Sequence, residues 1–129
     1  MRAAVIEALT RPYDSVWLLK DMETQEFELV RVDEKLAHLM PAQAAAKINK
    51  FYDAVTLYSR LVLEEDRQRF LEAVTPESIA RNMENKTIYS VPFRRVFPEG
   101  VRNYRLEFAR IDLGNGETNI VGGFKDVSE

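Results

Sequence analysis

Three carboxylates stand side by side in the sequence LVLEEDRQRFLEAV, which begins at residue 61: Glu64, Glu65 and Asp66. Clustered carboxylates can bind a metal ion or work as an acid/base pair. On a helix, however, consecutive side chains point about 100° apart, so these three cannot converge on one ion. Acidic residues in a first turn favour the helix dipole, and Glu65 is spaced to pair with Arg69. We interpret the triplet as a capped helix start with i,i+4 ion pairs.

His38 is the only histidine of the chain. A single histidine can ligate haem or act as a general base, because its pKa lies near neutral. No nucleophile with an orienting third group can be placed beside it, and a zinc site is disfavoured because there is no second histidine and no cysteine. We expect His38 to be solvated on a short helix, and we assign no catalytic residue and no metal ligand.

Five arginines fall on two adjacent predicted strands: Arg94, Arg95, Arg102, Arg105 and Arg110. Such a group can form a surface for an anionic ligand. Acidic residues are interleaved with them, however, and the whole chain carries a net charge of −3. We therefore expect a solvated sheet face with cross-strand ion pairs.

Gly122 and Gly123 lie inside the last predicted strand. Glycine in a strand indicates a bulge, or the close approach of another backbone or a ligand. Neither G-x-G-x-x-G nor G-K-[ST] accompanies the pair, so it is not a phosphate-binding loop.

Aromatic residues are spread along the chain, and most must fill a core. A small α+β domain whose helices cross a curved sheet can nevertheless leave a pocket between its layers. The candidates for lining such a pocket are Trp17, Tyr52, Phe70, Phe93 and Phe108.

The composition excludes several classes of protein. The 129 residues suit one domain, and 46% of them are hydrophobic. The absence of cysteine removes disulfides, thiolate sites and cysteine nucleophiles. A mildly acidic chain has no electrostatic attraction to nucleic acid or to anionic membranes. With no apolar run near ~20 residues and no signal peptide, we expect a cytoplasmic protein without membrane insertion.

The hydrophobic pattern changes period along the chain, from strands to helices and back to strands. The predicted helices cover residues 2–10, 34–40, 47–62, 64–74 and 75–86, with Asp33 and Thr75 as caps. The predicted strands cover residues 15–21, 26–32, 87–97, 101–113 and 118–127, with turns at PEG and GNGE. This order indicates an α+β fold with a five-stranded antiparallel sheet and its helices on one face.

Several short sequence motifs, in this order of elements, resemble those of a PAS (Per-Arnt-Sim) sensor domain. The resemblance is to the type found upstream of GGDEF diguanylate cyclase domains in bacterial signalling proteins. VLEEDRQRF is similar to the family's VHPDDRxRF, with Asp66, Arg67 and Phe70 at matching places. YSVPFRRVFPEGVRNYRLEFARI resembles the family's pair of central strands, and IVGGFKDVSE its closing strand. The likeness covers residues 13–129, and residues 1–12 precede it as an N-terminal helix.

The resemblance implies a regulatory sensor or dimerisation module without catalysis of its own. It implies a homodimer, an effector domain in the same polypeptide and a small-molecule ligand, with Asp126 and Val127 at the exit toward the effector. We expect residues 1–12 to form a dimer contact or to pack on their own sheet. The ending DVSE, where the family continues, indicates a piece of a longer protein.

The chain also departs from the family's patterns. The His-Pro that often precedes the acidic pair is absent here. The chain lacks the cysteine of flavin-adduct photoreceptors, and it has no histidine in the region that ligates haem in haem-binding relatives. No cofactor can therefore be carried over from the family.

Two other functions stay open on the sequence. One is a small cone-shaped α+β enzyme that acts on a hydrophobic substrate with a buried carboxylate, for which Asp53 or Asp66 would be the acid/base. A pocket-facing carboxylate with a raised pKa would favour that enzyme. The other is a ligand-free protein-interaction domain.

Overall fold

The computed structural model describes residues 12–32, 34, 38, 50–84, 86–112 and 118–128. In chain order the helical elements are α4 (Phe51–Tyr58), the short 3-10 helix η1 (Ser59–Leu61), α5 (Glu64–Ala73) and α6 (Pro76–Met83). The strands are β1 (Ser15–Leu19), β2 (Phe27–Arg31), β3 (Ile88–Phe97), β4 (Gly100–Asp112) and β5 (Thr118–Asp126). The predicted helix at 2–10, the Asp33 cap and the GNGE turn lie outside the described residues.

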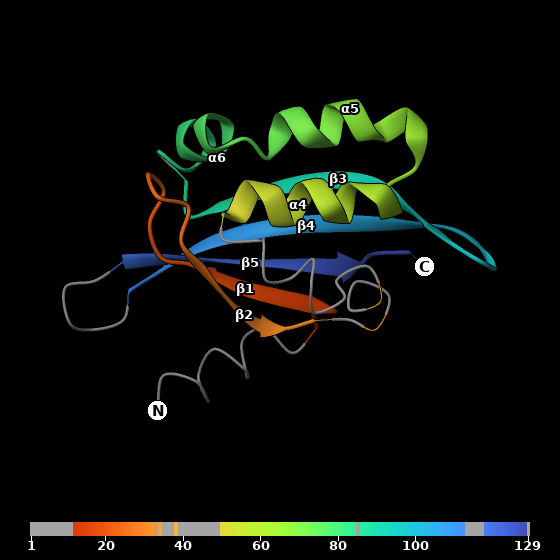
Figure 1. Cartoon of the computed structure of the whole chain (residues 1–129), viewed down its shortest axis with the longest axis horizontal. Coiled ribbons are helices and arrows are strands. Elements are labelled where there is room, and N and C mark those ends of the chain that lie inside the picture. The colour runs from red at the N-terminus through yellow and green to blue at the C-terminus, as the bar shows by residue number, and fades with distance from the viewer. Residues whose placement is uncertain are drawn as a thin grey trace.

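The five strands form one antiparallel sheet in the order β2-β1-β5-β4-β3. Helices α4, α5 and α6 cover one face of it (Figure 1). The predicted fold class is therefore confirmed. The predicted turn at PEG is confirmed as well: its last residue, Gly100, has φ +144°, a backbone conformation that favours glycine, and begins β4.

The helix boundaries follow local rules. Helix α6 begins as predicted, because the Thr75 hydroxyl accepts a hydrogen bond from the Ser78 N–H at 3.2 Å and Pro76 occupies the first helical position. Helix α5 begins at Glu64 with three acidic residues in its first turn, but no side chain caps it. The predicted helix over 47–62 ends earlier than expected, at Tyr58, and continues as η1.

Aromatic side chains from both layers fill the core. The rings of Tyr58 on α4 and Phe124 on β5 stack with centroids 3.5 Å apart and planes 4° apart. The ring centroids of Phe70 on α5 and Phe93 on β3 are 5.0 Å apart. These contacts fix α4 onto the central strand β5 and α5 onto the edge strand β3, since aromatic pairs add specific geometry to the burial of apolar area.

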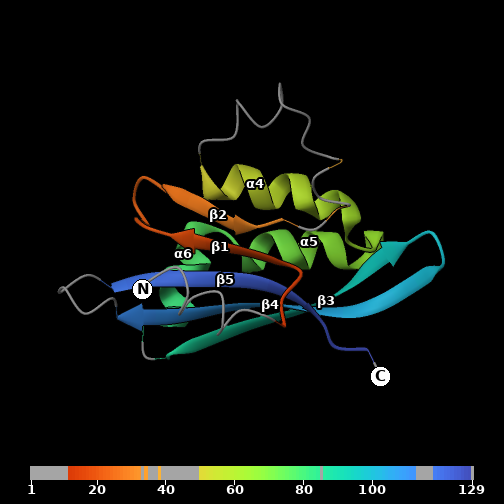
Figure 2. The same ribbon diagram turned by 90° about the horizontal axis from the view of Figure 1, so that it is seen from below.

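Strand β1 is buried on both of its faces, because all five of its residues are buried. Trp17 and Leu19 belong to the core under the helices. Val16 and Leu18 alternate with them and join Val121 in a second apolar cluster. That second cluster therefore lies on the face of the sheet opposite the helices, which is the face seen in Figure 2.

Candidate functional site

Arg95 was expected on a solvated sheet face, and that prediction is wrong. Arg95 is only 1% exposed. Every second side chain of β3 points toward the core, and Arg95 is at one of these positions. The guanidinium carbon lies 5.4, 4.7 and 5.2 Å from the ring centroids of Tyr58, Phe97 and Tyr104. Nη1 also donates to the Tyr58 hydroxyl at 3.2 Å. The rings stabilise the buried cation through their faces.

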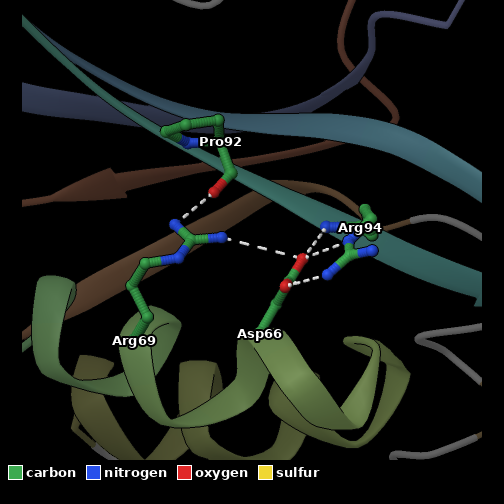
Figure 3. Close-up of polar contacts among 4 residues, drawn as sticks. All are labelled: Asp66, Arg69, Pro92 and Arg94. Carbon is green, nitrogen blue, oxygen red and sulfur yellow. Dashed lines mark hydrogen bonds and ion pairs between the residues drawn. The ribbon is translucent and has the colours of Figure 1, made fainter.

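Arg94, the next residue, binds Asp66 at the start of α5 (Figure 3). Asp66 Oδ1 accepts from Arg94 Nη2 at 2.6 Å. Asp66 Oδ2 accepts from Arg94 Nε and from the Arg94 backbone N–H, both at 2.9 Å. Arg69 Nη2 lies 3.7 Å from Asp66 Oδ2, so Arg69 pairs at i,i+3 with Asp66 in place of the predicted i,i+4 partner, Glu65. Asp66 is a buried anchor between α5 and β3, which its sequence neighbours did not indicate.

This cluster covers the free edge of the sheet. Strand β3 is an edge strand, so half of its backbone groups point away from β4. The Arg94 carbonyl accepts from the Leu63 N–H at 2.8 Å. The Pro92 carbonyl accepts from Arg69 Nη1 at 2.7 Å, as Figure 3 shows. The backbone of Pro92 has the same outward orientation. An N–H at this position would point away from β4, so proline, which has none, removes no hydrogen bond from the sheet. Helix α5 thus blocks pairing of another strand at this part of the edge.

The environment of Asp66 sets its charge. Hydrogen bonds from the Arg94 guanidinium lower the pKa of Asp66, and burial opposes them without cancelling them. A carboxylate that stays ionised is a poor general acid. Asp53, the other candidate of the enzyme hypothesis, is exposed on α4. Asp66 is therefore not the carboxylate with a raised pKa that would favour an enzyme, and Asp53 is not buried among the aromatic residues.

The remaining arginines follow the prediction more closely. Arg102 Nε donates to Asp126 Oδ2 at 2.5 Å, which joins β4 to β5 as a cross-strand ion pair. Arg105 lies 3.7 Å from Glu107 on the same strand. Arg110 instead donates from Nη2 to the Met83 carbonyl at the end of α6, at 2.9 Å.

The predicted pocket residues lie together in the core between the helices and the sheet. Trp17, Phe70, Phe93 and Phe108 are all buried in the core cluster, and half-buried Tyr52 packs against its margin. The indole N–H of Trp17 is buried and has no hydrogen-bond acceptor among the described residues. That these five residues line a ligand pocket stays a prediction.

Gly122 and Gly123 make room for aromatic rings. A Cβ on Gly122 would lie 2.5 Å from Trp17 Nε1, and one on Gly123 would lie 2.8 Å from the Tyr13 ring. The pairing of β5 with both neighbours runs through these positions without a break in register. The close approach was predicted, but it comes from two side chains of the chain itself, and β5 has no bulge there.

Directly after β5, residues 127 and 128 are hydrogen-bonded to the neighbouring strand β4. The Val127 N–H donates to the Asn103 carbonyl at 2.9 Å, and the Ser128 hydroxyl accepts from the Asn103 N–H at 2.7 Å. Burial acts to raise the pKa of Asp126, but hydrogen bonds from the Ser128 N–H and from Arg102 outweigh it and leave that pKa lowered. Asp126 is thus held as an anion at the point where β5 ends.

His38 is exposed in helical backbone, as expected. Across the described ranges, no group of three or more histidine, aspartate or glutamate side chains is arranged to hold a metal ion. No helix among the same residues has the length and apolar character needed to cross a membrane.

Comparison with known protein families gives no matching family model, and comparison with curated protein sequences gives no match. Comparison with solved structures does find similar chains. The PAS domain of Bordetella pertussis BvgS has a TM-score of 0.55 and 14% sequence identity, over 99% of this chain and 88% of that one. The N-terminal domain of a diguanylate cyclase with PAS/PAC sensor from Marinobacter aquaeolei has a TM-score of 0.48 and 17% identity, over 88% of this chain and 94% of that one. With its strand order and its helices on one face, the chain has a PAS fold.

Proposed function

We propose that the chain is a regulatory sensor and dimerisation module of a bacterial signalling protein, with no catalysis of its own. Its effector would be in the same polypeptide, and a diguanylate cyclase domain is the effector we favour. The module would work in the cytoplasm as a homodimer, with residues 1–12 as a dimer contact ahead of the domain at residues 13–129. A small-molecule ligand between the layers would contact Trp17 and its aromatic neighbours.

The observation that carries this proposal is the construction of the chain's exit. Residues 126–128 are joined to the end of the sheet by hydrogen bonds and one ion pair to Arg102 and Asn103. Each such bond contributes about 1 kcal/mol, so a small change in the sheet is enough to release or to tighten the exit. A ligand or partner can shift this balance only by binding one arrangement more tightly than the other.

The closely packed core favours a second function, a ligand-free interaction domain. Tyr58 and Phe124 stack at 3.5 Å, and Phe70 and Phe108 have no exposed surface. In that case a partner domain would bias the exit without any bound molecule.

Native mass spectrometry, with an absorption spectrum of the purified protein, tests the proposal. The sensor predicts a dimer of the 14.9 kDa chain that carries the added mass of a bound small molecule. A dimer without added mass favours the interaction domain. A monomer without added mass contradicts the proposed sensor and dimerisation module.

A further inference from the structure

Two adjacent residues fix the beginning of the described chain to both faces of the sheet. The Tyr13 hydroxyl donates to Glu107 Oε1 at 2.6 Å, and its ring packs with the cluster on the face away from the helices. The next carboxylate, Asp14, accepts a hydrogen bond from the Tyr104 hydroxyl, and Tyr104 belongs to the core under the helices. Residues 13 and 14 are the entrance of the domain, and β4 binds them on both faces of the sheet.

The entrance and the exit lie at the same end of the sheet, because β1 and β5 are antiparallel neighbours (Figure 2). The Asp14 N–H donates to the Phe124 carbonyl at 2.8 Å. Two residues further along β5, Asp126 is the register partner of Tyr104 on β4. One residue before Tyr104, Asn103 binds the exit through Val127 and Ser128.

Tyr104 thus lies between the entrance and the exit of the domain: it is hydrogen-bonded to Asp14 and is the register partner of Asp126. Its side chain reaches Asp14, and its ring lies against the Arg95 guanidinium and 6.0 Å from Phe93. Burial, with the Asp14 hydrogen bond next, strongly raises the pKa of Tyr104, so its hydroxyl stays a proton donor at neutral pH. A buried donor bound to a carboxylate makes a stronger hydrogen bond than a neutral pair does.

We propose that Tyr104 couples the exit of the domain to its entrance: a displacement of residues 126–128 moves β4 at Asn103 and, through the Tyr104 hydroxyl, loosens Asp14. The coupling deepens the proposed function and rests on it for its biological use. It would connect whatever precedes Tyr13 with an effector that follows Ser128. It needs no bound ligand, since every contact in it belongs to the chain.

Amide hydrogen exchange of this chain, measured residue by residue by NMR, tests the coupling. Ser128→Ala removes the hydroxyl bonds to Asn103 and should speed exchange at the Asp14 amide by about fivefold, the equivalent of one ordinary hydrogen bond. Tyr104→Phe should speed it by itself, and adding Ser128→Ala to Tyr104→Phe should then change nothing further at Asp14. Asp14→Ala, which removes the acceptor of the Tyr104 hydroxyl and leaves the buried ring in place, should abolish the Ser128→Ala effect in the same way.

Tyr89→Phe is the matched control. Its hydroxyl donates to the Ala73 carbonyl at 2.9 Å, so this variant also removes one tyrosine hydrogen bond from the same sheet but leaves both chain ends alone. It should not alter the response of Asp14 to Ser128→Ala. Urea unfolding of each variant separates local opening from a change in global stability.

The coupling is wrong if Ser128→Ala leaves exchange at Asp14 unchanged, or if its effect is the same with Phe at position 104. Neither result would decide the sensor proposal, which is tested separately by the mass of the dimer and of a bound ligand. Conversely, an intact coupling in a ligand-free monomer would overturn that proposal and leave the coupling in place.

Discussion

The carboxylate of Asp66 binds the backbone N–H as well as the guanidinium of Arg94, 28 residues away in the sequence. The side-chain bonds join α5 to β3, and the backbone bond satisfies a donor on the open edge of the sheet. One buried side chain thereby positions a helix and closes a strand edge.

Asp66→Asn should destabilise the domain by about 1–3 kcal/mol at neutral pH, because a buried, charge-assisted set of hydrogen bonds is lost. Urea unfolding followed by circular dichroism measures the change. Glu65→Gln is the control, since Glu65 lies in the same turn but is exposed. Equal losses in the two variants would show that the charge of the helix start matters and the contact to Arg94 does not.

The stability of the domain should also depend on pH through Asp66. Its pKa in the folded state is lowered below the ordinary value of 3.8, so its contribution is fully present above that value and is lost as the pH falls through the lowered one. The difference in unfolding free energy between the natural chain and Asp66→Asn should therefore shrink below pH 3.8. A difference that stays constant from pH 6 down to pH 2 would contradict this assignment.

Arg95→Ala should cost about 2–4 kcal/mol, because it empties a buried volume and removes a cation from between three rings. Arg105→Ala removes the same side chain from an exposed position on β4 and should cost well under 1 kcal/mol. Thermal or urea unfolding of both variants compares them directly. If the two losses are similar, the aromatic surroundings of Arg95 contribute nothing to stability.

Gly122→Ala should force the indole of Trp17 to move, because the new Cβ would approach it to 2.5 Å. We expect a loss of about 1–3 kcal/mol, typical of overpacking, and a shift of the emission maximum. Trp17 is the only tryptophan of the chain, so its fluorescence reports this site alone. Gly123→Ala is the control: it displaces the half-buried Tyr13 ring and should leave the tryptophan emission unchanged.

Local patterns were enough to predict the fold. Alternation on β3 and β4, the cap at Thr75 and the acidic start of α5 each depend on near neighbours, and the structure has all three. The same alternation could have indicated that Arg95 points inward with Val91 and Phe93. The alternation is not decisive for Arg95, because an arginine is almost never fully buried unless its charge is compensated.

The polar contacts could not be predicted in the same way. Asp66 and Arg94 are 28 residues apart, and Asp14 and Tyr104 are 90 residues apart. Which residues meet depends on the strand order and on the side of β3 where α5 lies, and neither follows from spacing along one helix. The glycine pair in β5 indicated a close approach, but the approaching rings come from the opposite end of the chain.

The central claim, that this domain regulates an effector through its exit, is tested most directly in a chimaeric diguanylate cyclase. The chain replaces the sensor domain of such an enzyme, with linkers lengthened one residue at a time over seven positions to sample every helical phase. We predict that Ser128→Ala changes the rate of cyclic di-GMP formation by about fivefold or more in at least one phase, whereas Tyr89→Phe does not. Rates that are the same for the natural chain and Ser128→Ala at every linker length would contradict the account.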